Sequence, residues 1–270
     1  MSETMNFECI DNQKFAAIAG QPFDQITLIL DRVVYGITHL VCRQFRKLKN
    51  GPPCVLITSY SDASLTPQMA NQLPPNVLYW FSTNVMTTNP RVIPIPIGFA
   101  FKLDHQRLCL ERRAAGRLER KNLMYVNFFR HIARNPNPRE GMYEQFGGHD
   151  WTTVEGGLPD IYVSIEDFYT GVQSHDYVLS PPGAGLDCHR HWEAMALGSI
   201  PIVLRSRATE SLLGDMPCLI VEHWDEVTKE RLEGERDQLL SRFLEPCMQK
   251  MDMNYWREVI GNEIHNLRHT

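Results

Sequence analysis

The 270-residue sequence has no uninterrupted apolar run of about 18 residues, no excess of basic charge and no repeat with a period of roughly 20 to 50 residues. We therefore expect no stable membrane insertion, and residues 1–15 carry charges where a signal peptide needs an apolar segment. The 27 Lys and Arg against 32 Asp and Glu give a net charge of −5, which disfavours a nucleic-acid partner. Glycine and proline, 17 of each, are close to average usage, which excludes low-complexity disorder. The sequence indicates a soluble globular protein, which we expect in the cytoplasm.

Paired cysteines are also missing. The sequence has an odd number of cysteines, widely scattered and without a Cys-x-x-Cys motif: Cys9, Cys42, Cys54, Cys109, Cys188, Cys218 and Cys247. This pattern favours reduced, buried thiols over a disulfide framework.

Apolar residues make up 43% of the chain and occur in short runs that alternate with amphipathic stretches. We predict helices over residues 22–50, 105–121, 164–176 and 186–198, and an almost wholly helical pattern from residue 227 onward. Buried strands are predicted over residues 54–58, 77–81, 123–128, 177–179, 199–204 and 218–221. Residues 91–100 contain prolines that suit an edge strand.

This alternation predicts βαβ units with parallel sheets, so the expected fold class is α/β, with two small Rossmann-like domains and a cleft between them. The N-terminal domain is predicted over residues 1–115 and the C-terminal domain over residues 116–245. A C-terminal helix over residues 246–270 is expected to pack back on the first domain.

The most informative segment is residues 177–204, in which a strand enters the turn PPGAG and a helix is expected to begin near residue 186 or 187. Glycines allow close approach of backbone N–H groups, and a helix N-terminus presents unpaired donors, so phosphate is the expected ligand. His189, Arg190 and Glu193 share one face of this helix. An ordinary turn and an exposed Arg190–Glu193 ion pair remain open as alternatives.

Two further interpretations of this segment stay open. Asp187, Cys188, His189 and His191 suggest a metal site, although adjacent residues point about 100° apart on a helix and no second ligand pair has zinc-like spacing. Cys188 at a helix N-terminus, near imidazoles, suggests a nucleophile.

The run LSPPGAGLDCHRHWEAMALGSIPIVL, with MYVNFF upstream and CLIVEHWDE downstream, resembles the carboxy-terminal nucleotide-sugar-binding half of exostosin-like glycosyltransferases. Members of this family carry a similar SP-G-G-D-HR-WEA-LG-IPIV series. The similarity covers residues 123 to about 226. A weaker resemblance lies upstream, where the spacing of WFSTNV to IPIPIGFA is similar to that in small, soluble members found in large algal DNA viruses and some microbes. If the protein is encoded by a virus, we expect it in the host cytoplasm.

The resemblance implies a GT-B fold, in which the second domain mainly holds a nucleotide-sugar donor and the first mainly holds the acceptor. Unlike the animal exostosins, this chain is expected to have neither a membrane anchor nor a second transferase domain, so their heparan-type substrate is not carried over. Xylose is the expected donor sugar, by analogy with the small viral members. Because the sequence has no Asp-x-Asp triplet, we expect no divalent metal, with the diphosphate charge met by backbone donors and cationic side chains.

The expected donor-binding residues come from the PPGAG turn, the helix after it and the loop after the strand 123–128. Glu193 is implied by the resemblance as the acceptor of hydrogen bonds from the ribose hydroxyls. The loop residues, Arg134 among them, also suit an ordinary solvent-exposed surface. The complete predicted donor set is Asn127, Arg130, His131, Gly183, Gly185, Asp187, His189, Arg190 and Glu193.

Inverting transfer requires a base for the acceptor hydroxyl, and a carboxylate is the usual choice. Asp62, in the polar loop after the strand 54–58, is the predicted catalytic residue, and its alternative role is to cap the next helix. Asp104 and His105 are second choices. At the end of the strand 77–81, Ser82 and Asn84 could bind acceptor hydroxyls or cap a turn. Trp80 and Phe81 could stack on a sugar or belong to the core.

The leading hypothesis is a metal-independent inverting glycosyltransferase that uses a UDP-sugar and a glycan acceptor. A noncatalytic nucleotide- or carbohydrate-binding module and a Cys/His metalloenzyme are the alternatives. The sequence leaves the acceptor, the linkage and the oligomeric state open.

Overall fold

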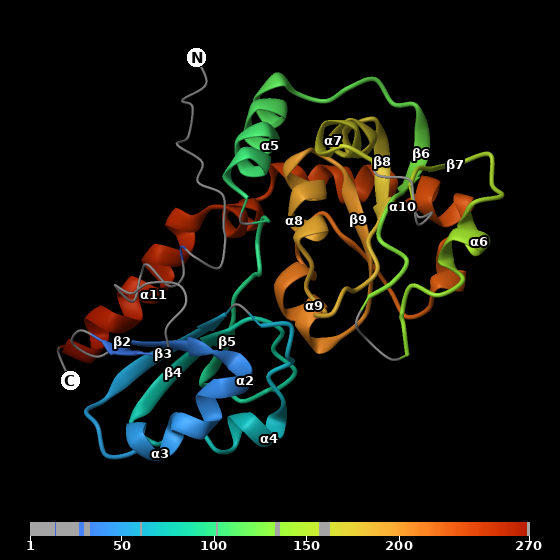
Figure 1. Cartoon of the computed structure of the whole chain (residues 1–270). Coiled ribbons are helices and arrows are strands. Elements are labelled where there is room, and N and C mark those ends of the chain that lie inside the picture. Colours follow the sequence, from blue (N-terminus) through green and yellow to red (C-terminus); the bar gives the residue numbers. More distant parts are fainter. Residues whose placement is uncertain are drawn as a thin grey trace. The chain divides into compact units, whose positions relative to one another are not determined.

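The computed structural model describes residue 14 and residues 27–29, 33–59, 61–100, 102–132, 136–156 and 163–268 (Figure 1). The chain divides into two compact units. Unit 1 comprises Met1–Phe101, Gly185–Asp187 and Gln249–Thr270, and unit 2 comprises Lys102–Ala184 and Cys188–Met248. The boundary after Phe101 comes before the charged helix, residues 105–121, where the sequence predicts it. The segment Gly185–Asp187, which begins at the last residue of the PPGAG turn, groups with unit 1.

The described part of unit 1 contains a five-stranded sheet with the order β1-β2-β3-β4-β5. β1 pairs with β2 antiparallel and the other neighbours are parallel. The strands are β1 (Thr27–Ile29), β2 (Val33–Ile37), β3 (Cys54–Ser59), β4 (Val77–Ser82) and β5 (Val92–Pro94). The helices are α2 (Thr38–Val41), η2 (Cys42–Gln44), α3 (Phe45–Leu48), α4 (Pro67–Ala70) and α11 (Met253–Arg268). Figure 1 shows α3 and α4 on one face of this sheet and α11, which contacts β3, on the other.

The single helix predicted over residues 22–50 is wrong. Residues 27–29 and 33–37 form strands, and among the described residues of this stretch helical structure begins at Thr38. Residues 22–26 and 30–32 of the prediction lie outside the described residues. Valine and isoleucine are residue types that favour strands, and three of them occur at positions 33, 34 and 37. Val34 is buried in the strand that pairs with β3 in parallel. The spacing of apolar residues here fits a helix equally well, and pairing with β3 selects the strand.

Unit 2 contains a wholly parallel five-stranded sheet with the order β10-β9-β8-β6-β7. The strands are β6 (Asn122–Val126), β7 (Thr152–Val154), β8 (His175–Leu179), β9 (Ile200–Leu204) and β10 (Leu219–Val221). The α-helices are α5 (Leu103–Ala115), α6 (Met142–Phe146), α7 (Ile165–Gln173), α8 (His189–Ala196), α9 (Arg207–Leu213) and α10 (Lys229–Ser241). Short 3-10 helices follow as η3 (Trp224–Glu226), η4 (Arg242–Leu244) and η5 (Pro246–Met251), the last of which crosses into unit 1. The predicted α/β class with parallel sheets is confirmed.

The strand order of unit 2 reverses direction once. From β6 the chain moves to β7 on one side, then returns to place β8 on the other side of β6, with β9 and β10 beyond it. In open parallel sheets, ligands bind outside the carboxyl ends of the strands at such a reversal. The region after β6 and β8 is therefore the topologically favoured binding place of unit 2.

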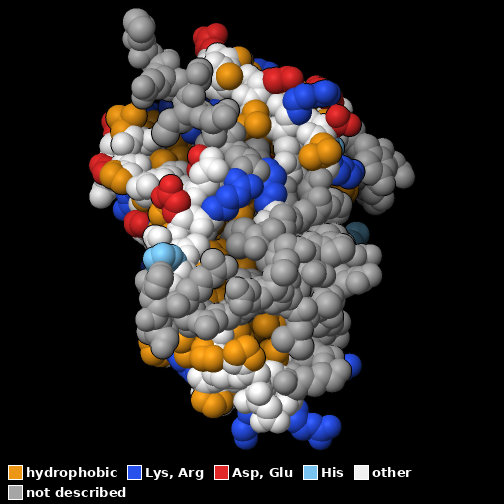
Figure 2. Space-filling model, turned by 90° about the vertical axis from the view of Figure 1, so that its left-hand side faces the viewer, with side chains coloured by type: hydrophobic (Ala, Val, Ile, Leu, Met, Phe, Trp, Pro, Cys, Tyr) orange, Lys and Arg blue, Asp and Glu red, His pale blue; other side chains and the backbone are white. Residues whose placement is uncertain are grey.

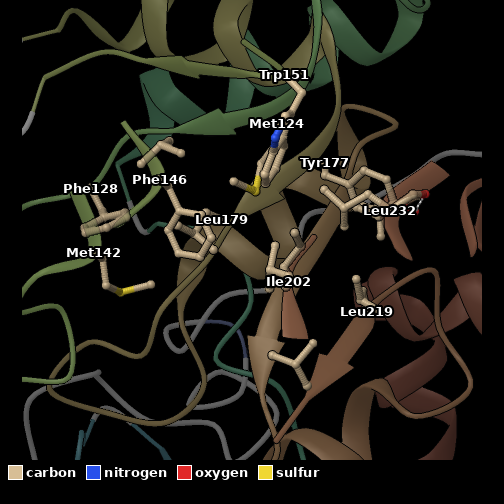
Figure 3. Close-up of a cluster of buried hydrophobic side chains, with 14 of the residues drawn as sticks. Met124, Phe128, Met142, Phe146, Trp151, Tyr177, Leu179, Ile202, Leu219 and Leu232 are labelled. Atoms are coloured by element: carbon tan, nitrogen blue, oxygen red, sulfur yellow. Dashed lines mark hydrogen bonds between the residues drawn. The ribbon is translucent and has the colours of Figure 1, made fainter. Parts of the chain in front are cut away.

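A core cluster of apolar side chains supports this end of the sheet (Figure 3). It joins residues of β6, β8 and β9 to side chains of α6 and α10. Figure 3 shows Phe128, Met142 and Phe146 close together at one side of the cluster. Phe128, the second residue after β6, is 3% exposed and anchors the loop that follows.

The surface of unit 2 carries both signs of charge. Arg107 of α5 lies 3.4 Å from Asp104 and 3.8 Å from Glu111, and all three side chains are exposed. Figure 2 shows acidic and basic side chains interspersed over the described part of one face. Within the part of the chain that the structure describes, no helix is long and apolar enough to cross a membrane.

Candidate functional site

The backbone after β6 is fixed by one hydroxyl group. Phe128 N–H donates to Tyr143 Oη at 2.7 Å, and the same hydroxyl donates to the Phe128 carbonyl at 2.5 Å. The two rings lie 4.6 Å apart. Tyr143 of α6 thus satisfies both backbone groups of a buried residue and holds the start of the loop in place.

Arg139 connects the loop after β6 to the loop after β8. Its Nε donates to the Pro182 carbonyl at 2.9 Å and its Nη1 donates to the Phe129 carbonyl at 2.9 Å. The side chain is buried, and its Nη2 lies 3.4 Å from the position that a Cβ on Gly183 would take. Sequence reasoning missed Arg139, because it lies in a proline-rich loop without periodicity.

Arg190, in the first turn of α8, is the second cation of this site. Its Nη1 is buried and has no hydrogen-bond partner, although part of the side chain remains exposed. The guanidinium carbons of Arg190 and Arg139 lie 5.6 and 5.7 Å from the centroid of the Phe128 ring. Neither guanidinium forms an ion pair with a described carboxylate, so the exposed Arg190–Glu193 pair considered from the sequence is not formed.

Burial lowers the pKa of both cations, and repulsion by Arg190 adds to the effect on Arg139. Burial, followed by the charge of Arg190, lowers the pKa of Arg139 to about 10. Burial also lowers the pKa of Arg190. Both groups are still charged at neutral pH. The charge of Glu193 acts against the effect of burial at Arg190, but neither guanidinium forms an ion pair with a described carboxylate. Two partly desolvated cations close together are unfavourable, and an anion bound beside them would relieve this. We call Arg139 and Arg190 the arginine pair.

A third arginine stands near the pair. Arg130 lies with its guanidinium 4.5 Å from the Tyr143 ring centroid and pairs with Glu144 at 2.5 Å. Burial raises the pKa of Tyr143, while the charges of Arg190, Arg130 and Arg139 act in the opposite direction. Arg130 is therefore close to the pair, but its charge is already compensated.

The other predicted donor residues of unit 2 occupy different environments. Asn127 donates from Nδ2 to Tyr125 Oη at 2.9 Å, and Tyr125 Oη donates to Glu155 at 2.8 Å. His131 is exposed and Glu193 is buried on α8. His189 is the first residue of α8, and Arg134 lies outside the described residues.

The backbone donors of the PPGAG region are mostly occupied. Gly183 N–H donates to Cys188 Sγ at 3.0 Å, and the Leu186 and Asp187 N–H groups donate to Asn84 Oδ1 at 3.0 and 2.9 Å. The prediction that these amides are unpaired is therefore wrong. The N–H groups of Ala184 and Gly185 make no hydrogen bond with a described residue.

The helix α8 consequently begins later than predicted, at His189 with Cys188 as its N-cap. His191 accepts the Cys188 N–H on Nδ1 at 3.3 Å and contacts the Ser180 carbonyl through Nε2 at 3.2 Å. Both nitrogens of this imidazole are thus used by the backbone, which argues against His191 as a metal ligand. Among the described residues, no group of three His, Cys, Asp or Glu side chains is arranged to hold a metal ion.

Residues Gly185–Asp187 fold with unit 1, where Asn84 holds them. Asn84 is buried, has a left-handed backbone φ of 51°, and also donates to the Ser61 carbonyl at 3.2 Å. Asp187 Oδ2 accepts the Ile97 N–H at 2.8 Å. Asp187 and Asn84 therefore hold this segment in place, a structural role that the sequence did not indicate.

Asp62 lies beside the same segment. A Cβ on Gly185 would stand 3.3 Å from Asp62 Oδ1 and 3.1 Å from Asn84 Nδ2, so glycine permits this close approach. The Asp62 side chain is exposed and makes no hydrogen bond or ion pair with a described residue. The alternative that Asp62 caps the next helix is wrong, because Thr66 is the N-cap of α4.

The remaining candidates of unit 1 belong to its interior. Trp80 and Phe81 are fully buried, and Trp80 Nε1 donates to Thr58 Oγ1 at 2.8 Å. Ser82 accepts from the same threonine at 2.9 Å. The hypothesis that Trp80 and Phe81 stack on a sugar is therefore wrong, and they are core residues.

No family model matches the sequence, and no curated protein matches it. Among solved structures, the chain is similar to one described as the crystal structure of the GtfA/B complex, with 12% sequence identity and a TM-score of 0.48. The likeness covers 90% of this chain and 58% of that one. A likeness of this extent assigns no activity to the chain.

Proposed function

We propose that the protein is a metal-independent inverting glycosyltransferase that transfers a sugar from a UDP-sugar to a hydroxyl of a glycan acceptor. The observation that carries the proposal is the arginine pair, two partly desolvated cations at the strand reversal of unit 2 that form no ion pair with a described carboxylate. A diphosphate supplies the missing negative charge, and guanidinium groups bind phosphate oxygens in fixed geometry. The sequence resemblance supplies the class of donor, and xylose is the proposed sugar.

The donor diphosphate is proposed to lie against Arg190 and Arg139, with the Ala184 N–H as a backbone donor. Arg139 Nε and Nη1 hold the two loops, so its guanidinium is fixed where the diphosphate is proposed to bind. Glu193 is proposed to accept hydrogen bonds from the ribose hydroxyls. Proposed supporting contacts, from the rest of the predicted set, come from Asn127, Arg130, His131, Gly185 and His189. Gly183 and Asp187 are left to shape the turn, because Gly183 N–H donates to Cys188 Sγ and the Asp187 carboxylate accepts the Ile97 N–H.

Asp62 is the proposed base. Its carboxylate would take the proton of the acceptor hydroxyl as the oxygen forms its bond to the anomeric carbon of the donor sugar. The bond from that carbon to the diphosphate breaks, and its electron pair leaves with UDP. Asp62 suits this role because it is exposed and free of described partners.

The departing diphosphate gains negative charge as the bond breaks. The arginine pair can stabilise that charge without reorganisation, because Arg139 is held by two backbone carbonyls. In this proposal the two cations take the electrostatic role that a divalent ion has in metal-dependent transferases. This is the physical basis for proposing a metal-independent reaction.

The test is turnover of a panel of UDP-sugars with mixed hydroxyl acceptors, measured as release of UDP with and without EDTA. We expect UDP release that depends on the acceptor and is unchanged by EDTA. Activity lost to EDTA and restored by manganese contradicts metal independence. UDP binding without turnover on any acceptor favours the noncatalytic nucleotide-binding module.

A further inference from the structure

Phe129 is an exposed aromatic side chain at the strand reversal. Of the large apolar side chains that are exposed in the described part of the chain, it alone is aromatic, with 72% of its surface accessible. Its neighbour Phe128 is 3% exposed and belongs to the core. The folding of unit 2 therefore accounts for the burial of Phe128 but gives no reason for an aromatic ring at residue 129.

The backbone that carries this ring is held on each side. The Phe129 carbonyl accepts from Arg139 Nη1 at 2.9 Å, and the Phe128 backbone is bound by the Tyr143 hydroxyl. On the other side, the Arg130 carbonyl accepts from Asn137 Nδ2 at 2.7 Å. The Phe129 ring is thus presented to solvent from a fixed backbone.

The cations near the Phe129 ring indicate which class of ligand would bind there. The same Arg139 that holds the Phe129 carbonyl belongs to the arginine pair, which calls for an anion. A ligand that satisfies both features carries a phosphate and a flat ring in one molecule. A nucleoside diphosphate has this combination, and aromatic side chains stack on bases of any identity because every base has a π face.

We propose that Phe129 is the stacking platform for the nucleobase of the donor nucleotide, an inference that rests on the proposed function. In this arrangement the arginine pair binds the diphosphate and Phe129 contributes affinity for the base. Phe129 would then distinguish a nucleoside diphosphate from a bare phosphate.

The experiment is calorimetric titration of UDP and of pyrophosphate into the full chain and three variants. Phe129→Ala removes the ring, Phe129→Tyr keeps it, and Leu244→Ala removes an apolar side chain that is 91% exposed elsewhere in unit 2. We expect Phe129→Ala to weaken UDP binding about tenfold or more while leaving pyrophosphate binding unchanged. Phe129→Tyr and Leu244→Ala should bind both ligands as the parent does.

Equal loss of UDP and pyrophosphate binding in Phe129→Ala would overturn the inference, because the residue would then shape the loop. Unchanged UDP binding would overturn it as well, because the ring would then make no contact with the base. In each of these cases the parent still binds UDP, so the proposed function survives. A parent protein that binds neither ligand refutes the proposed function and this inference together.

Discussion

Arg139 Nε donates a hydrogen bond to the carbonyl oxygen of Pro182 at 2.9 Å. This bond joins the segment after β6 to the segment after β8, the two strands between which the sheet of unit 2 reverses. Arg190, by contrast, has an Nη1 that is buried without a partner. The two members of the arginine pair therefore contribute differently to the folded state.

Substitution by methionine should separate these contributions. Arg139→Met leaves the Pro182 and Phe129 carbonyls without their donor and should lower the free energy of unfolding by about 1–3 kcal/mol. Arg190→Met removes a partly desolvated cation and should leave the ligand-free protein as stable as the parent or more stable. Urea unfolding without added anions measures both values. A larger loss in Arg190→Met than in Arg139→Met would show that Arg190 is a structural residue.

Asn84 is expected to hold the Gly185–Asp187 segment in place. Asn84→Ala and Asn84→Gly both remove the acceptor of the Leu186 and Asp187 N–H groups, at a cost of about 1–3 kcal/mol. Alanine should be the worse of the two, because its Cβ disfavours the left-handed φ of 51° that glycine adopts freely. Thermal unfolding of the two variants gives the order. Equal stability of the parent and both variants would contradict the role of Asn84.

Two helical glycines should respond oppositely to alanine. A Cβ on Gly171 of α7 would lie 2.3 Å from Tyr125 Cζ, so Gly171→Ala should be destabilising by about 1–3 kcal/mol. Gly234 of α10 has nothing within 4 Å of that position, so Gly234→Ala should be neutral or stabilising by up to about 1 kcal/mol. Chemical unfolding of the two variants provides the comparison, and effects of the same sign would indicate that the packing of α7 differs from the one described.

His175 should make stability depend on pH. Its Nδ1 donates to the Gly171 carbonyl at 2.6 Å, and its Nε2 lies 2.7 Å from Thr153 Oγ1, whose hydroxyl can donate to a neutral ring. Burial holds the pKa of His175 below its ordinary value of 6.5. The unfolded chain therefore binds a proton that the folded chain excludes, and stability is lost as the pH falls below about 6.5, by at most about 1.4 kcal/mol per unit. Unfolding of the parent and His175→Gln at pH 7.5 and 5.5 tests this, and equal pH dependence in both proteins would contradict it.

Asp62→Asn should abolish transfer while UDP affinity stays close to that of the parent. The amide cannot take a proton, so kcat should fall about 100-fold or more. Asp104→Asn is the matched control, because Asp104 was the second choice for the base and lies on α5 with 88% of its side chain exposed. Steady-state kinetics of the two variants decides between them. Near-parental turnover in Asp62→Asn would remove it as the base.

Parts of this fold could be predicted because the signals are local. The short apolar runs of unit 2 became its strands, and the proline-containing residues 92–94 form an edge strand. Residues 27–37 could not be assigned correctly, because the same spacing of apolar residues suits a helix and a paired strand. Only pairing with β3, a long-range interaction, selects the strand.

The site was partly predictable for the same reason. Arg190 could be found from its place after a strand and a glycine-rich turn. Arg139 could not, because its significance comes from two carbonyls that approach it only in the folded chain. Asn84 likewise reaches Asp187 across 103 residues, which no local pattern reports.

The central claim is that the arginine pair forms an anion receptor for a diphosphate. Calorimetric titration of pyrophosphate at low ionic strength into the parent and Arg190→Met tests it most directly. We predict saturable binding by the parent and at least about tenfold weaker binding by Arg190→Met, the loss expected for one charge-assisted contact. Equal affinity in the two proteins, or no binding to the parent, would contradict the claim.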